Sequence, residues 1–143
     1  MKYFLKLNVV SILYAVMVVV PIELMVNVYR ISRVTNWEIN TVITVLSLTI
    51  IGEVIAGTVL LSFLTKKWMG GRKGNYWTVI LWVPYFILFA YIVANAFPIT
   101  YEGDAPNPAV GLLIIGGMLA YPFNILVINY LSSPRDDKTM KAA

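Results

Sequence analysis

The segment "INTVITVLSLTIIGEVIAGTVLLSFL", residues Ile39 to Leu64, decides the fold class because it is apolar almost throughout. It exceeds the length of about 20 residues that an α-helix needs to cross the hydrocarbon core of a bilayer. A helix satisfies its own backbone hydrogen bonds, which is what lipid requires of any spanning structure. We therefore expect a transmembrane helix here, with one carboxylate, Glu53, near its middle.

Three further apolar segments have the same character, so the sequence predicts an all-α integral membrane protein with a four-transmembrane-helix bundle. They cover residues 7–29, 76–97 and 109–131. We interpret the first as a retained helix because no small-residue cleavage site follows its apolar run. The four helices are expected to form one domain, residues 1–131, followed by a polar cytoplasmic tail, residues 132–143.

The distribution of basic residues predicts the orientation, because Lys and Arg accumulate in the short cytoplasmic loops of membrane proteins. Only Arg30 and Arg33 lie in the loops that would be outside. The other nine lie before the first helix, between the second and third, and after the fourth: Lys2, Lys6, Lys66, Lys67, Arg72, Lys73, Arg135, Lys138 and Lys141. We expect both termini to be cytoplasmic in a multi-pass protein of the plasma (cytoplasmic) membrane.

Composition supports a bilayer location and excludes much chemistry. Hydrophobic residues make up 59% of the chain, charged residues 13%, and the mean hydropathy is +0.78. There is no Cys and no His, which removes the usual metal and haem ligands and the usual general base. We expect no cofactor, no metal site and no catalytic residues. The net charge of +4 is explained by topology signals, so no nucleic-acid partner is expected.

Glu53 is the main candidate site residue. Counted at about 1.5 Å per residue, it lies within roughly 3 Å of the bilayer centre. An ionised carboxylate facing lipid is unfavourable, so we expect Glu53 to be protonated, hydrogen-bonded within the bundle or facing a wet cavity. Tyr121, at the same depth, and Asn124 on the same helix are its expected partners. The site either binds a proton or a cation, or acts as polar packing between helices, and the sequence leaves both open.

A second group of polar residues is expected nearer the outer surface. Glu23 lies roughly 8 Å outward of the midpoint of its helix. Asn27 follows it by one turn, and Tyr91 on the third helix lies at the same level.

Small residues predict which helices pack closely, because they let backbones approach in lipid. We expect the second helix to pack on the fourth through Gly52 and Ala56 against Gly116 and Ala120. Of the loops, "GGRKGN" is interpreted as a cytoplasmic turn that touches anionic lipid. "YEGDAPNP", with Glu102 and Asp104, is interpreted as a solvated turn.

Two short resemblances bear on Glu53 and Glu23. "GEVIAGT", Gly52 to Thr58, resembles the glutamate segment of the small multidrug resistance transporters, four-helix proteins that exchange protons for cationic drugs. Their glutamate lies on the first helix, whereas Glu53 lies on the second. "PIE", Pro21 to Glu23, resembles the Pro-x-Glu-Glu motif of membrane lycopene cyclases, with Leu24 in place of the second acid. We carry no residue over from either family.

Two functions are therefore expected ahead of any enzymatic one. The first is a non-enzymatic accessory, regulatory or immunity-type module that packs against a larger membrane partner or against itself as a homo-oligomer. The alternative is a small proton- or cation-coupled transporter built around Glu53. An enzyme comes third, because it would have to act through Glu23, Glu53 and tyrosines alone.

Overall fold

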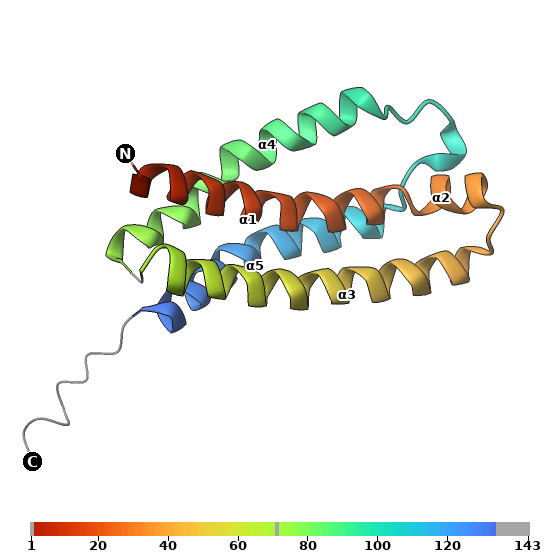
Figure 1. Cartoon of the computed structure of the whole chain (residues 1–143). Helices are drawn as coiled ribbons and strands as arrows, with labels where there is room; N and C mark the ends of the chain where they lie inside the picture. Colours follow the sequence, from red (N-terminus) through yellow and green to blue (C-terminus); the bar gives the residue numbers. More distant parts are fainter. Residues whose placement is uncertain (1, 71, 134–143) are drawn as a thin grey trace, which may run out of the picture.

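The computed structural model describes residues 2–70 and 72–133, and its regular elements over this part of the chain are all helical. Four long helices carry the fold, with shorter helical segments between them (Figure 1). In chain order the elements are α1 (Lys2–Val26), α2 (Val28–Thr35), α3 (Ile39–Phe63), η1 (Leu64–Trp68), η2 (Lys73–Trp77), α4 (Thr78–Ala96), η3 (Glu102–Asp104) and α5 (Pro108–Ser132).

The prediction of four helices capable of crossing a membrane is confirmed. Each is long and apolar enough, and the spans run over Lys2–Val26, Ile39–Trp68, Lys73–Ala96 and Pro108–Ser132. The first span begins at Lys2 rather than at residue 7, and a π-helical turn, η1, extends the second beyond Phe63. Of the expected tail, only residues 132 and 133 are described, and the remainder lies outside the described residues.

The segment expected as an outer loop, residues 30–38, is largely helical, which corrects the sequence interpretation. Helix α2 follows α1 after Asn27 and is amphipathic, with Val28 and Ile31 partly buried and Arg33 exposed. Asn36 ends it in the left-handed region, at φ 56°, a conformation that Asn tolerates better than most residues. The sequence search for long apolar runs overlooks a short amphipathic helix of this kind.

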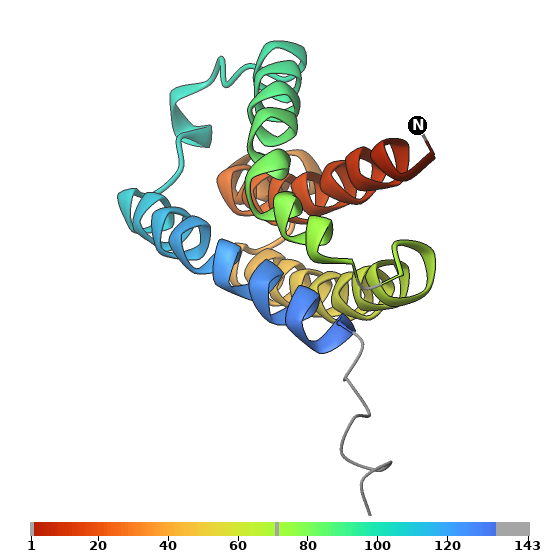
Figure 2. The same ribbon diagram turned by 90° about the vertical axis from the view of Figure 1, so that its left-hand side faces the viewer.

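Helix α1 is the centre of the bundle, and its main partner is α4 (Figures 1 and 2). Tyr14 of α1 is fully buried, and Tyr121 of α5 packs edge-on against it with ring centroids 6.3 Å apart. Trp82 of α4 packs edge-on against Tyr121 at 5.1 Å and against Phe86 at 5.7 Å. This aromatic seam of Tyr14, Trp82, Phe86 and Tyr121 joins α1, α4 and α5.

Helices α3 and α5 do contact each other as expected, but the prediction that Gly52 and Gly116 form this contact is wrong. A Cβ added at Gly52 or Gly116 would meet no atom within 4 Å, and Ala56 and Ala120 are exposed. The glycine of α3 that does allow close approach is Gly57, where an added Cβ would lie 2.3 Å from the Met17 sulfur of α1. Gly57 therefore allows contact with α1, whereas Gly52 on α3 and Gly116 on α5 face open space.

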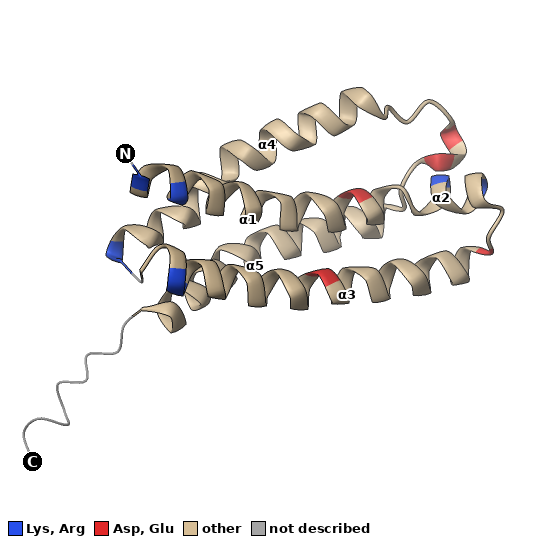
Figure 3. Ribbon diagram, in the orientation of Figure 1, with Lys and Arg blue, Asp and Glu red and all other residues tan. Residues whose placement is uncertain are grey.

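Charged residues of the described chain gather at the two ends of the helices (Figure 3). The end where α1 begins carries only Lys and Arg among its described charged residues. The opposite end, where α2 lies, carries Arg30 and Arg33 together with acidic residues. Glu53 and Glu23 are the acids within the long helices.

Candidate functional site

Glu53 lies within α3 and is partly buried, as expected for a carboxylate that avoids lipid. One of its oxygens, Oε2, is buried and has no hydrogen-bond partner among the described residues. A buried polar atom without a partner is costly, and such atoms commonly mark a functional group or an unseen water or proton. One oxygen of the Glu53 carboxyl group is therefore buried without a hydrogen-bond partner among the described residues.

The two expected partners of Glu53, Tyr121 and Asn124, lie in different surroundings: Tyr121 is partly buried and Asn124 is exposed. The Tyr121 hydroxyl donates to the backbone carbonyl of Tyr14 at 2.7 Å, so its one donor is used within the aromatic seam. Asn124 is exposed, and its side chain forms no hydrogen bond with any residue that the structure describes. Among the described residues, neither side chain forms a hydrogen bond with Glu53.

Tyr121 and Asn124 instead line a groove between α1, α3 and α5, which we call the α5 groove. Its volume is about 270 Å³. The walls are mostly apolar: Met17, Val18, Pro21, Ile22, Met25, Val54, Thr58, Leu113, Ile114, Gly117, Met118, Ala120, Tyr121 and Asn124. Because Leu113 and Val54 are exposed at 66% and 44%, the groove opens to the outer surface of the helices. Its polar groups are few, and Asn124 is the exposed amide among them.

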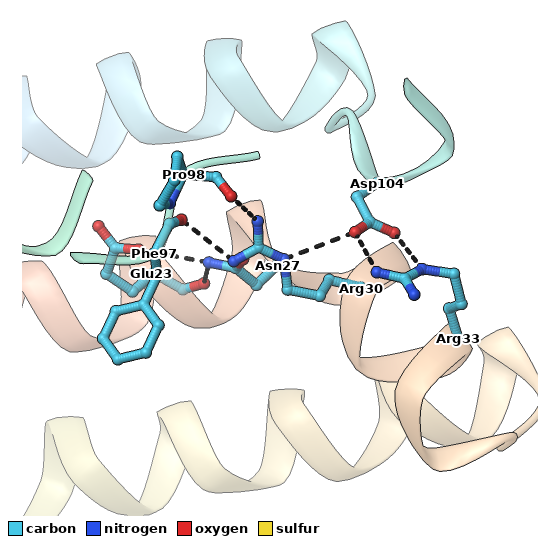
Figure 4. Close-up of polar contacts among 7 residues, drawn as sticks. All are labelled: Glu23, Asn27, Arg30, Arg33, Phe97, Pro98 and Asp104. Atoms are coloured by element: carbon cyan, nitrogen blue, oxygen red, sulfur yellow. Dashed lines mark hydrogen bonds and ion pairs between the residues drawn. The ribbon is translucent and has the colours of Figure 1, made fainter. Parts of the chain in front are cut away.

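Of the polar residues expected nearer the outer surface, the structure brings Glu23 and Asn27 together but not Tyr91. Asn27 donates through Nδ2 to the Glu23 carboxylate at 3.3 Å and to the Glu23 backbone carbonyl at 2.9 Å (Figure 4). Glu23 and Asn27 are therefore paired at the end of α1, as their one-turn spacing predicts. Tyr91 is 68% exposed on α4, and its side chain forms no hydrogen bond within residues 2–70 and 72–133, so it does not join them.

A charged cluster at the α2 end was not anticipated. The Arg33 guanidinium donates to both Asp104 carboxylate oxygens, at 2.9 and 2.7 Å, and Arg30 Nε lies 3.5 Å from the same carboxylate (Figure 4). Arg30 also donates to the backbone carbonyls of Phe97 and Pro98, at 3.1 and 2.7 Å. We call these contacts the arginine latch, because they tie α2 to the loop between α4 and α5.

The arginine latch corrects the interpretation of the loop over residues 101–108 as a solvated turn at Asp104 alone, because the other residues of this loop are exposed. Asp104 is only 2% exposed, and the hydrogen bond from Arg33 is the main reason that its pKa lies below the ordinary value of 3.8. The same bond raises the pKa of Arg33. Arg30 and Arg33 lie one turn apart in an amphipathic segment, a pattern that indicates a basic face on a short helix. The sequence does not indicate which carboxylate they contact.

A second set of polar contacts, also missed from the sequence, lies where α1 begins. Tyr3 donates to the Asn75 side chain at 2.8 Å, the Thr78 hydroxyl donates to the Asn75 carbonyl at 2.7 Å, and Asn129 donates to the Thr78 hydroxyl at 3.0 Å. These bonds link α1, η2, α4 and α5. Asn75, Thr78 and Asn129 are all buried, so they fix the packing of this end.

No group of three acidic, His or Cys side chains in residues 2–70 and 72–133 is arranged to hold a metal ion. Comparison of the chain with protein families, with curated proteins and with solved structures finds no match. Function must therefore be argued from the residues themselves.

Proposed function

We propose that the protein is a non-enzymatic integral membrane module, of accessory, regulatory or immunity type. On this proposal it acts by packing α5 against a transmembrane helix, supplied by a larger membrane partner or by a second copy of the chain. The observation that carries the proposal is the exposed amide of Asn124 inside an apolar span.

An exposed amide in a membrane helix favours a partner helix. Lipid offers no hydrogen bonds, whereas a neighbouring helix can accept from the amide nitrogen of Asn124 and donate to its oxygen. Such interhelical bonds contribute about 0.6 to 2 kcal/mol. The position of Asn124 at the edge of the α5 groove also lets a bulky side chain of the partner enter the groove.

The surroundings of Asn124 favour the same function. Gly116 and Gly117 have open space beside them, and Ala120 is exposed one turn before Asn124. Small residues at a four-residue spacing let a second backbone come close, which strengthens dispersion contacts in lipid. Within the described residues, no atom lies within 4 Å of a Cβ added at Gly116 or Gly117, so these positions can admit a contact between chains.

The test is affinity purification of the full chain in mild detergent, with wild type compared against Asn124→Leu and Gly116→Leu. We expect a stoichiometric partner or a homo-oligomer, and a loss of about tenfold in association for either variant. Gly52→Leu is the matched control, because Gly52 is equally open but lies on α3. An unaltered monomer that purifies alone, or equal losses for all three variants, would contradict docking through α5.

We also propose that the protein lies in the plasma membrane with both termini on the cytoplasmic side. Single cysteines placed at Lys73 and Glu102 test it, because both residues are exposed and the chain has no other cysteine. An impermeant thiol reagent should label the Glu102 position in intact cells and leave the Lys73 position unlabelled. The reverse pattern would invert the topology.

The second candidate, a proton- or cation-coupled transporter, is favoured by the unpartnered Glu53 oxygen. Glu53→Gln separates the two candidates, because an amide keeps the shape and hydrogen bonding but cannot exchange a proton. A transporter would remain folded and lose proton-coupled flux in vesicles. A packing role predicts normal stability and phenotype for Glu53→Gln, and a loss of about 1 to 2 kcal/mol of helix association for Glu53→Leu.

A further inference from the structure

A pocket rich in positive charge lies at the end of the bundle where α1 begins. It has a volume of about 510 Å³ and is lined by Lys2, Tyr3, Lys6, Lys67, Trp68, Met69, Gly70 and Arg72. Four of these residues are cations, and they come from α1, from η1 and from the turn before η2. We call this the basic pocket.

Aromatic rings and hydrogen bonds hold two of these cations in place. Lys6 donates to the backbone carbonyl of Trp68 at 2.9 Å and lies 5.5 Å from the centre of the Trp68 ring. The Arg72 guanidinium lies 5.2 Å from the centre of the Tyr3 ring. Cation–π contacts of this length are attractive and limit side-chain motion. The positive charges are therefore partly ordered before any ligand arrives.

The backbone beneath the pocket is shaped to hold Tyr3. The Tyr3 hydroxyl donates to Asn75, which is buried. A Cβ added at Gly74 would lie 2.7 Å from that hydroxyl, so the close approach depends on a glycine at this position. Met69, 2% exposed, completes the buried side of the pocket.

The charge of the basic pocket is not neutralised by carboxylates within the described residues. Within the described residues, both ion pairs involve Asp104 and belong to the arginine latch, at the opposite end of the bundle. Like charges gathered in one pocket repel each other, so an anion that enters it relieves this repulsion.

An apolar groove adjoins the basic pocket. It shares Lys67 and Trp68 with the pocket, and its other lining residues are Val9, Phe63 and Leu64. Its volume is about 410 Å³. A free phosphate ion would use only the charged part, whereas a lipid would place its headgroup in the pocket and an acyl chain along the groove.

We propose that the basic pocket binds the phosphate-bearing headgroup of an anionic membrane lipid, with an acyl chain in the adjoining groove. Basic pockets at the ends of transmembrane helices are suited to anionic headgroups, and each Lys or Arg near a charged membrane surface adds to the attraction. The site goes beyond the docking function of α5, and it lies on other elements of the chain.

The test measures lipid binding to the purified full chain in a neutral detergent, with bound lipid counted by native mass spectrometry. The probes are short-chain phosphatidylglycerol, short-chain phosphatidylcholine and inorganic phosphate. We expect phosphatidylglycerol to bind in preference to the other two. The double variant Lys67→Gln, Arg72→Gln should weaken its binding about tenfold or more.

The matched control is the double variant Lys66→Gln, Lys73→Gln. It removes the same charge from the same end of the bundle, but neither residue lines the basic pocket. We expect this control to weaken binding by less than about threefold. Circular dichroism and thermal unfolding in phosphatidylcholine confirm that both variants fold before binding is compared.

Three results would overturn the proposal. Equal losses in the two double variants would show general charge attraction, and equal binding of phosphatidylcholine would show that the headgroup charge is not recognised. Binding of inorganic phosphate as tight as that of phosphatidylglycerol, with the same dependence on Lys67 and Arg72, would assign the pocket to a free ion.

Discussion

Helices α1 and α3 are alike in length and in apolar composition, but they meet different surroundings. Within the most apolar part of each span, 33% of residues are buried inside the protein for α1 and 6% for α3. Hydropathy measures transfer out of water, and both lipid and a protein interior meet that demand. Side-chain shape and polar contacts, rather than hydropathy, therefore determine which helix becomes the centre of the bundle.

The contacts of Tyr14 and Met17 explain why α1 lies at the centre of the bundle. Tyr14 lies in the aromatic seam, and Met17 packs over Gly57, a site where a side chain on α3 would interfere. In lipid, helices associate through van der Waals contact and interhelical hydrogen bonds. Helix α3 contacts its neighbours over a smaller share of its length, so most of its surface is exposed.

The largest expected effect comes from breaking the aromatic seam. Trp82 is 3% exposed, and its ring packs against those of Tyr121 and Phe86. Trp82→Ala should lower the free energy of unfolding by about 3 kcal/mol, through lost contacts and the cavity left behind. Trp77→Ala, at a position 62% exposed, should change it by less than about 0.5 kcal/mol. Denaturation in detergent, followed by circular dichroism, measures both, and equal losses would remove the distinction between inner and outer faces.

A smaller effect on stability is expected from replacing either of two glycines on α3 by Leu, one that contacts α1 and one that does not. Gly57→Leu must displace Met17 and should cost about 1 to 3 kcal/mol of stability. Gly52→Leu enters open space and should cost less than about 0.5 kcal/mol. The same unfolding assay applies. Greater destabilisation by Gly52→Leu would mean that α3 presents its other side to α1.

The smallest expected effect concerns the arginine latch, because Arg33 is half exposed. The pKa of Asp104 is lowered in the folded state, chiefly by Arg33, so the latch stabilises the fold fully above the ordinary carboxyl value of 3.8. Its contribution should be constant from pH 7 to about 5 and should disappear as the pH falls through the lowered pKa. Thermal unfolding at each pH, with Asp104→Asn as reference, isolates the latch from other carboxylates. A difference between the two proteins that grew on acidification would contradict the assigned direction.

The four spans could be predicted from the sequence because each depends only on local length and hydropathy. Asn27 bonding Glu23 was also within reach, since their spacing along one helix brings them together. Helix α2 was not predicted, because its amphipathic pattern is short and lies beside a longer apolar run. Asn75 and Asn129 gave no signal either, because a polar residue near the end of a span gives no indication of its burial.

Local patterns in the sequence were enough to predict the helical class, four helices long and apolar enough to cross a membrane, and the separation of charge between the two ends of the described chain. These properties follow from the cost of placing backbone and charged groups in lipid, which each segment meets on its own. Only the tertiary structure decided that α1 is central, that Gly57 rather than Gly52 allows close packing, and that Arg33 meets Asp104. These contacts join residues far apart in the chain, and in lipid the choice among similar apolar helices rests on shape and a few hydrogen bonds, which no local pattern records.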